Sequence, residues 1–392
     1  MDPTAVICRV RDSFTQPLSL PDLPEAYTGA PAQLRPELRF TREPNLPCQY
    51  ADAAEYAGLQ TLKDQFTPHS NEALNKARAR ANPHERIGSS IFMDRAGVKL
   101  ANIDAVYHLV DLPFSLFQRQ HYEHAFHFLD LAGGPGAFSQ YLLWRYPASR
   151  VTGMTLRTGD KLDWNMEQLG IDHFTAVYGG DETGDLYTNW AWLLDYETHL
   201  EAEGFDAVLA DGGIDIGAEY RRQEVLSSRL LLSEAVVGIG RTKPGGAFVL
   251  KVFDTVTSIS AQTIYLLSCC FERVSLFKPI SSRPANAESY LICQRRRAQV
   301  EGPLSLGRAA LTAWAAEPAS QLAQLFPPEL MPVDFQSWLV AQNQLSIHRQ
   351  VEHVRLVLLA LAGSPLDLPQ LDLRLALAAW AIPDNPQSKP RR

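Results

Sequence analysis

The chain has 392 residues, 46% of them hydrophobic and 20% charged, so it can bury a substantial core. Its formal net charge of −8 argues against a protein that binds nucleic acid nonspecifically over its whole surface. No apolar run is long enough to span a membrane, and the first residues lack the apolar segment of a secretory signal. We therefore expect a soluble, intracellular protein.

The cysteines fit a reducing compartment. There are five, an odd number, and none stand in the C-x-x-C spacing of a zinc module. We expect them to be packing residues; they are Cys8, Cys48, Cys269, Cys270 and Cys293.

The chain changes character at about residue 58. Residues 1–58 are rich in proline and turn formers and show no sustained periodicity, which predicts an irregular lead. From Asn71, the expected helix cap, the pattern becomes helical, and Pro83 interrupts it. Residues 86–110 carry a continuous apolar side, which predicts a second helix.

A glycine-rich stretch forms the centre of the sequence. The apolar residues 126–131 are followed by the small residues 132–136 and then by an amphipathic segment that reaches Trp144. This order predicts a strand, a tight loop and a helix N-terminus. Because glycines allow close approach of the backbone and helix N-termini attract electron-rich atoms, we expect the loop to hold a nucleoside-bearing ligand.

Strand-like and helix-like segments alternate after this loop. A long helix is expected over residues 219–241, ended by Lys243 to Gly246. Alternation predicts an α/β fold with a seven-stranded, mostly parallel sheet and helices on both faces. Ligands of such sheets bind beyond the carboxyl ends of the strands, where the glycine loop and Asp211 fall. The six further strands are predicted at residues 151–156, 174–179, 206–211, 247–253, 272–277 and 289–294.

The alternation stops after residue 297. We predict a helical C-terminal extension, residues 298–392, packed on the core domain of residues 59–297. Its last eight residues should fray. The helices are expected at residues 304–325, 335–344, 349–362 and 371–381.

Two nucleotide ligands compete for the glycine loop. A dinucleotide-dependent dehydrogenase needs an acidic residue at the end of the second strand, but that strand ends in Thr155, Leu156 and Arg157. S-adenosylmethionine is bound by the same type of loop, and Asp185 after the third strand suits a contact with the adenine edge. Asp185 is equally suited to a turn beside Gly184, and both interpretations stay open.

Two charged residues stand where a parallel strand should be apolar. Lys251 interrupts one strand, and Asp211 ends another. A lysine inside a strand needs a partner or a function, because an unpaired interior charge is costly. When such a lysine is paired with a carboxylate, desolvated and close to a second cation, its pKa should fall from about 10.4 toward the range of a usable base. Lys251 is therefore a candidate proton acceptor.

Four stretches resemble the FtsJ-type 2′-O-ribose methyltransferases, and more closely the eukaryotic cap-specific mRNA methyltransferases that modify the first transcribed nucleotide. The similarity spans about residues 63–297. The stretches are FMDRAGVKLANIDAVY (92–107), LDLAGGPGAFSQYLLW (129–144), LADGG (209–213), and the segment from LKVFD to CCFERVSLFKPISSRPANAESYLIC (250–293). The resemblance implies a Rossmann-like, S-adenosylmethionine-dependent methyltransferase fold.

The resemblance also implies site residues. The family's Lys-Asp-Lys-Glu tetrad is complete as Lys99, Asp211, Lys251 and Glu288. Lys251 would take the proton, the two acids would fix its ammonium group, and Lys99 would orient the hydroxyl and phosphate. The donor contacts would be Asp94, Ala132, Gly133, Gly134, Pro135, Gly136, Ala137, Phe138, Asp185 and Asp211. The contacts with capped RNA would be Lys63, Phe66, Arg78, Glu219, Tyr220, Arg221, Arg222, Gln223 and Asn286.

The implied function is methyl transfer from S-adenosylmethionine to the ribose 2′-hydroxyl of the first transcribed nucleotide of 7-methylguanosine-capped mRNA. We expect this in the nucleus, or in the cytoplasm if the chain is viral, and without a membrane partner. The alternatives are a ribosomal or transfer RNA 2′-O-methyltransferase and a non-catalytic RNA-binding homologue. We expect no metal, because His121, His124 and His127 lack an evident fourth ligand. The sequence assigns no oligomeric state.

Overall fold

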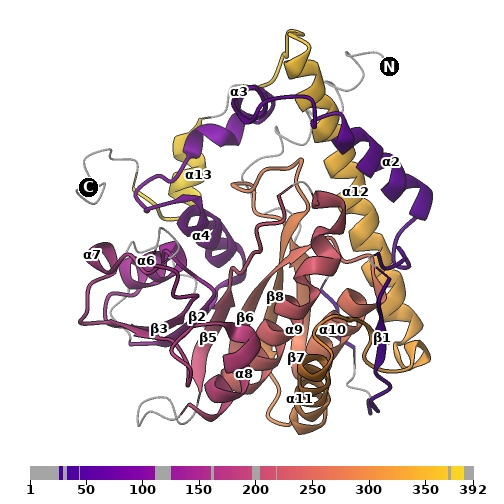
Figure 1. Cartoon of the computed structure of the whole chain (residues 1–392). Helices are drawn as coiled ribbons and strands as arrows, with labels where there is room; N and C mark the ends of the chain where they lie inside the picture. The colour runs from indigo at the N-terminus through magenta and orange to yellow at the C-terminus, as the bar shows by residue number, and fades with distance from the viewer. Residues whose placement is uncertain are drawn as a thin grey trace.

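A seven-stranded sheet forms the centre of the computed structural model (Figure 1), which describes residues 26–29, 33–43, 45–110, 125–159, 163–196, 204–217, 219–369 and 372–383. The strand order is β4-β3-β2-β5-β6-β8-β7. Strands β4, β3, β2, β5 and β6 run parallel to one another. The next strand, β8, pairs antiparallel with both β6 and β7. The strands are β2 (His127–Leu131), β3 (Arg150–Met154), β4 (Phe174–Val177), β5 (Phe205–Ala210), β6 (Thr242–Phe253), β7 (Phe271–Phe277) and β8 (Glu288–Arg296). This confirms the predicted mostly parallel sheet.

Both faces of the sheet are covered, because apolar side chains of each strand alternate between two cores. Leu129 and Leu131 of β2 pack with one group of helices, and Phe128, the residue before Leu129, packs with the other. One face carries α8 (Leu186–Asp195), α9 (Gln223–Arg241), α10 (Ser258–Cys270) and α11 (Glu301–Ala316). The other face carries α4 (Arg95–Tyr107) and α6 (Ala137–Arg145), with the short α7 (Met166–Leu169) beside them.

The segment before the sheet differs from the prediction at one helix. α2 (Ala53–Asp64) and α3 (Asn71–Ala81) precede the 3₁₀ turn η1 (Pro83–Ile87). The helix predicted over residues 86–110 begins only at Arg95, because residues 88–94 form turns. Gly88 and Ser90 have positive φ angles of 58° and 51°, which end any helix. The helix prediction was therefore wrong for residues 88–94.

The helix caps follow the sequence closely. The Ser70 side chain, rather than Asn71, accepts the hydrogen bond that caps α3. Asp94 caps α4 in the same way, with its carboxylate accepting from the Ala96 amide at 2.7 Å. Asp94 thereby lies at the N-terminus of the helix that carries Lys99.

The C-terminal part is more than a set of separate helices. Residues 317–325 do not continue α11 but contain β9 (Gln321–Gln324), which pairs antiparallel with β1 (Arg39–Thr41). The two helices predicted over residues 335–344 and 349–362 are one helix, α12 (Val333–Leu361), because no helix breaker lies between them. The turn η3 (Pro328–Leu330) precedes it, and the last described helix is α13 (Leu373–Ala379).

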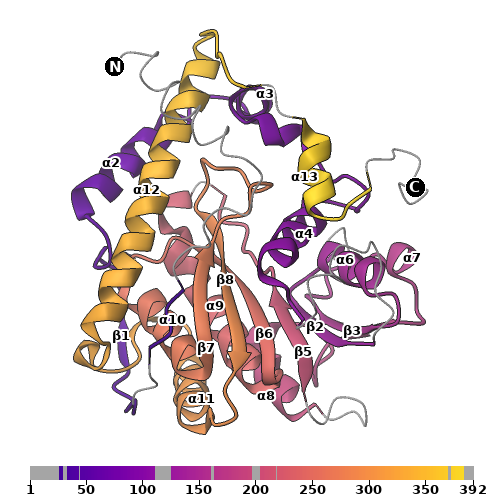
Figure 2. The ribbon, with the colours of Figure 1, turned by 180° about the vertical axis from the view of Figure 1, so that it is seen from behind.

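The long helix α12 belongs to the C-terminal part of the chain and contacts helices of the N-terminal part. It packs against α2 and α3, and Figures 1 and 2 show it on the opposite side of the molecule from α6 and α7. The division predicted at residues 58 and 297 stays a prediction. Within the described ranges, no helix is long and apolar enough to cross a membrane. The expected fraying of the last eight residues concerns positions outside the described residues.

Candidate active site

Four charged side chains converge at the carboxyl ends of β5 and β6. Lys251 Nζ donates to the Asp211 backbone oxygen at 2.5 Å and lies 3.1 Å from Asp211 Oδ1. Lys99 Nζ lies 2.8 Å from Glu288 Oε2. Their side chains are only 10% to 16% exposed, so both ion pairs are shielded from water. The predicted tetrad is thus two ion pairs set side by side.

The sheet register places three of the four residues. Ala210 of β5 pairs with Leu250 of β6. The next residue of each segment, Asp211 and Lys251, therefore lies at the same edge of the sheet. Phe253 of β6 pairs with Glu288, the first residue of β8. Lys99 reaches the same place from α4, which covers the sheet face opposite α9.

At Lys251, nearby carboxylates change the pKa by more than burial does. Burial alone would lower the pKa of its ammonium group, but Asp211, Glu288 and Glu234 raise it by more, so the net direction is upward. The expectation of a lowered pKa was wrong, because it gave too much weight to the desolvation and a second cation beside the paired carboxylate, and it missed Glu234. In the chain alone, Lys251 is an ammonium ion that donates hydrogen bonds.

Glu288 is held ionised. Burial raises its pKa, but Lys99 and Lys251 lower it by more, and the result is a pKa of about 2. The Ser282 hydroxyl also donates to its Oε1 at 2.6 Å. Glu288 therefore supplies a fixed negative charge between the two lysines.

The glycine loop lies at the same sheet edge. Ala132 follows β2 in a left-handed conformation, φ 51°, and donates to the Met154 carbonyl oxygen at 2.7 Å. A Cβ on Gly133 would meet Asp130 Oδ1 at 2.2 Å, and Gly136 has a φ of 113°. These two positions require glycine, so no side chain covers the backbone of the loop there.

Three carboxylates surround this loop. Burial raises the pKa of both Asp94 and Asp130, Asp211 raises both further, and the net result for Asp130 is about 7. Asp130 is fully buried, and its Oδ1 has no hydrogen-bond partner among the described residues. A cationic ligand would relieve this crowding of negative charge, because opposite charge favours the ionised carboxylate. S-adenosylmethionine, which carries a sulfonium and an ammonium group, fits the site.

Other residues predicted to contact S-adenosylmethionine lie close to the glycine loop. Two findings qualify this prediction. Gly134 donates to Thr155 Oγ1 at 3.3 Å, which joins the loop to the end of β3. Ala137 and Phe138 are buried in the core, where Phe138 packs near Tyr290, so only their backbone could face a ligand. Asp185 caps α8 by accepting from the Tyr187 amide at 2.8 Å, which is the turn role that its sequence also allowed.

One group of predicted RNA contacts forms its own network. The Lys63 ammonium donates to Gln350 Oε1 of α12 at 2.6 Å, and burial lowers its pKa. Its neighbour Asp64 binds the side chains of both Tyr220 and Arg221. The segment η2 (Tyr220–Arg222) is thereby joined to α2.

The remaining predicted contacts are more dispersed. Arg78 lines a small cavity with Arg283 and His353, between α3, α12 and the segment after β7. Asn286 accepts a hydrogen bond from Lys278 Nζ at 2.8 Å through its Oδ1. Phe66 packs against α2, α3 and α12, and Glu219 pairs with Arg222. Gln223 is the first residue of α9. Pro135, a predicted contact of S-adenosylmethionine, lies in the glycine loop.

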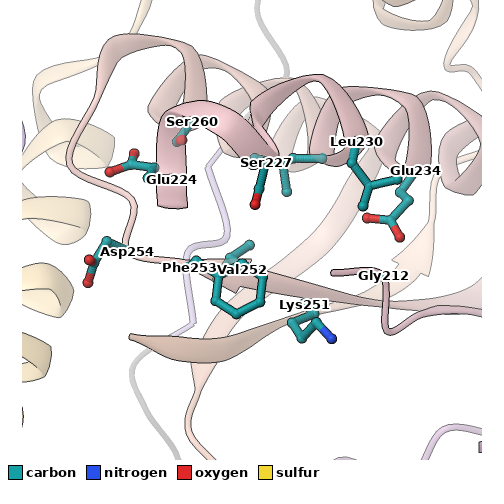
Figure 3. Close-up of a pocket in the computed structure, with 11 residues that line it drawn as sticks. Gly212, Glu224, Ser227, Leu230, Glu234, Lys251, Val252, Phe253, Asp254 and Ser260 are labelled. Atoms are coloured by element: carbon teal, nitrogen blue, oxygen red, sulfur yellow. The ribbon is translucent and has the colours of Figure 1, made fainter. Parts of the chain in front are cut away.

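Sequence reasoning missed residues that support the site. Lys278 Nζ donates to the backbone oxygens of Asn286 at 2.8 Å and Glu288 at 2.5 Å. The Tyr290 hydroxyl donates to Asp211 Oδ1 at 2.8 Å. Tyr290 pairs with Lys251 in the sheet register, which was visible only once β6 and β8 were known to be antiparallel neighbours. Glu234 of α9 is the buried acid that shares a cavity with Lys251 (Figure 3).

Candidate metal ligands do not cluster. Among the described residues, no group of three or more His, Cys, Asp and Glu side chains could hold a metal ion. His127 lies in β2, while His121 and His124 fall outside the described residues.

Comparison with known proteins places the chain. Residues 92–296 match the FtsJ-like methyltransferase family, which is more than half of the chain. The chain belongs to this family. As an FtsJ-like methyltransferase it uses the predicted donor, S-adenosylmethionine, and the predicted family is confirmed.

Several relatives are similar to this FtsJ-like methyltransferase over most of its length. Cap-specific mRNA (nucleoside-2′-O-)-methyltransferase 1 of Danio rerio is 36% identical over 60% of this chain and 30% of its own. The Homo sapiens protein of the same name is 29% identical over 86% of this chain and 44% of its own. The form 1A of Caenorhabditis briggsae is 29% identical over 85% of this chain and 43% of its own. The chain spans less than half of the length of these relatives.

Proposed function

We propose that this FtsJ-like methyltransferase methylates the ribose 2′-hydroxyl of the first transcribed nucleotide of 7-methylguanosine-capped mRNA. The observation that carries the proposal is the convergence of Lys99, Asp211, Lys251 and Glu288 beside the glycine loop. The similarity to cap-specific methyltransferases supports the choice of substrate.

A 2′-hydroxyl is a poor nucleophile, so the site must position it and remove its proton. When bound, S-adenosylmethionine supplies the methyl group and a positive sulfonium charge, and it leaves as a neutral thioether. Asp94, the backbone of residues 132–138 and Asp185 would hold it. Lys99 would orient the hydroxyl and the neighbouring phosphate.

Lys251 would act in two stages. As an ammonium ion, fixed by Asp211, it donates a hydrogen bond to the 2′-oxygen and so aligns it. A cation brought near this lysine lowers its pKa, because like charges disfavour the protonated form. Once the ammonium group has released a proton to solvent, Lys251 as a neutral amine takes the hydroxyl proton while the 2′-oxygen forms its bond to the methyl carbon and the bond from that carbon to the donor sulfur breaks. Asp211 and Glu288 stabilise the ammonium ion that results.

The arrangement around the tetrad suits capped RNA. Lys63, Arg78 and Arg221 supply positive charge on the α2–α3 side of the site, where the anionic bridge of a cap would lie. Tyr220 and Phe66 supply aromatic rings and Glu219 a carboxylate, the groups that favour a cationic methylated guanine. For a cellular chain we propose the nucleus as the location, and for a viral chain the cytoplasm, which imaging of a tagged protein would decide.

The test is methyl transfer from labelled S-adenosylmethionine to matched transcripts. We expect labelling of 7-methylguanosine-capped RNA and much weaker labelling of the same transcript without a cap. Digestion of the product should place the new methyl on the ribose of the first nucleotide. Label on uncapped ribosomal or transfer RNA instead would favour that class of substrate. Binding of RNA without any transfer would favour a non-catalytic homologue.

A further inference from the structure

Glu234 is a buried carboxyl group that the proposed chemistry does not use. It lies on α9 and is 1% exposed, and its Oε1 has no hydrogen-bond partner among the residues that the structure describes. It lines a small cavity together with Gly212 and Lys251. A buried polar atom without a partner costs stability, so its position beside the tetrad calls for a physical reason.

The carboxyl group of Glu234 packs against the backbone after β5. A Cβ on Gly212 would lie 2.2 Å from Glu234 Oε1, so only glycine allows this approach. Figure 3 shows Glu234 reaching from α9 toward Gly212, with Lys251 on the strand beyond. The same turn begins with Asp211, whose backbone oxygen and carboxylate hold the Lys251 ammonium group.

We propose that Glu234 is a positioning residue for Lys251: it supports the turn of residues 211–213 from behind and sets how readily Lys251 gives up its positive charge. Its consequence for turnover rests on the proposed methyl transfer. The coupling between the two side chains is a property of the chain alone and can be measured without donor or RNA.

The charge of Glu234 changes near neutral pH. Burial raises its pKa, Lys251 lowers it, Asp211 raises it and a hydrogen bond with the Gly212 backbone lowers it, and the result is about 8. Below that pH the acid is neutral, and Lys251 faces only the carboxylates of Asp211 and Glu288. Above it, a third negative charge holds Lys251 as an ammonium ion, so the two groups titrate as a coupled pair.

Few other titratable groups face Glu234. Besides Lys251 and Asp211, Tyr187 of α8 interacts with it electrostatically, and Arg229 interacts with Tyr187. Glu224 and Asp254 line the same cavity farther along. Glu224 is also buried, at 8% exposed, but accepts hydrogen bonds from the Thr257 amide and hydroxyl, so it offers a matched control.

The first experiment titrates Lys251 by NMR in protein labelled with ¹³C at the lysine ε-carbons, with its signal assigned by its loss in Lys251→Met. In the wild type, we expect this signal to shift near pH 8, where Glu234 ionises. In Glu234→Gln that inflection should vanish, and Lys251 should lose its proton about one pH unit lower. Glu224→Gln should keep the wild-type curve. A wild-type curve without the inflection, or identical curves for wild type and Glu234→Gln, would overturn the proposal.

The second experiment measures single-turnover methyl transfer against pH. Glu234→Gln should reach half-maximal rate at a lower pH than the wild type, with unchanged affinity for S-adenosylmethionine. A rate lowered equally at every pH would show a merely structural role and reject the proposal. If the wild type transfers no methyl group to any RNA, the proposed function fails, while the NMR titration still decides the role of Glu234.

Discussion

Lys99 Nζ lies 2.8 Å from Glu288 Oε2, although the two residues are 189 positions apart in the chain. One comes from α4 and the other begins β8, so the ion pair joins a helix on one face of the sheet to the antiparallel strand beside β6. Because both side chains are nearly buried, neither can be lost without leaving an unpaired charge in the interior.

Stability should depend on this pair in acid. The pKa of Glu288 is about 2 in the folded chain and lies near 4.5 when unperturbed. A carboxyl group whose pKa falls on folding stabilises the protein above its unfolded pKa and loses that contribution as pH falls toward the folded value. Glu288→Gln should therefore lower the free energy of unfolding at pH 7 by something on the order of 3 kcal/mol.

Denaturant titrations of wild type and Glu288→Gln at several pH values would check this. The difference between the two proteins should shrink as pH falls from about 4.5 to 2. A difference that stays constant through this window would contradict the assignment of a lowered pKa to Glu288.

Replacement of Lys251 by alanine should abolish methyl transfer while donor binding remains measurable. A positioned general base contributes about 10²- to 10⁴-fold to rate, and the donor loop lies on other elements. The control is Lys243→Ala on the same strand, whose ammonium group pairs with Asp206 and is 41% exposed. Wild-type turnover by Lys251→Ala in the labelled-donor assay would reject the proposed role.

Lys278→Met should weaken RNA binding and turnover together. Methionine keeps much of the side-chain volume but removes the hydrogen bonds that Lys278 donates to Asn286 O, Asn286 Oδ1 and Glu288 O. Because these bonds fix a proposed RNA contact and a tetrad residue, we expect a loss of at least about tenfold, which corresponds to one buried hydrogen-bond penalty. Donor affinity, measured by calorimetry, should stay unchanged.

The matched control for this lysine is Lys76→Met. Lys76 pairs with Glu72 on the same helix, and its side chain is 74% exposed. A surface pair of this kind contributes little, so the variant should behave as wild type. Equal effects of the two substitutions on RNA affinity would mean that Lys278 acts only through its charge and not through its contacts.

Gly133→Ala should distort the glycine loop. The new Cβ would lie 2.2 Å from Asp130 Oδ1, and Asp130 cannot move easily because its other oxygen accepts from the Ser139 amide and hydroxyl. Overpacking of this kind typically costs about 1–3 kcal/mol, so we expect a lower melting temperature and weaker binding of S-adenosylmethionine.

Gly302→Ala is the control for Gly133→Ala, because no atom lies within 4 Å of a Cβ placed at that helical position. It should leave donor affinity unchanged. Donor binding as tight in Gly133→Ala as in the wild type would argue that the loop is not the donor site.

The strands and Lys251 could be predicted from sequence for a common reason, whereas Lys99 and Glu288 came only from the family resemblance. Each central strand is a short apolar run bounded by turn residues, so its position is encoded locally. Lys251 stood out because it interrupts such a run. The pairing of β1 with β9 was missed because it joins distant parts of the chain, and no local pattern identifies the partner.

The charge state of Lys251 could not be predicted from the sequence, and the reason is related. The counted groups, Asp211, Glu288 and Lys99, came from the recognised motif, whereas Glu234 approaches from α9 on the other face of the sheet. Periodicity placed Glu234 on a helix with a continuous apolar side but gave no sign that it lies beneath Gly212. The register of β6 against β8 likewise had to be seen before Tyr290 could be placed.

The Gln350 side chain of α12 accepts from Lys63 and donates to Asp254 at 3.3 Å, immediately after the strand of Lys251. A fragment trimmed to residues 92–296 would keep the four tetrad residues and the methyl-donor loop, yet it would lack Lys63, Arg78 and the helix that braces Asp254. Work on such a fragment would then measure the chemistry of the methyl donor without several of the residues proposed to contact RNA, and a lack of cap preference there would say nothing about the intact chain.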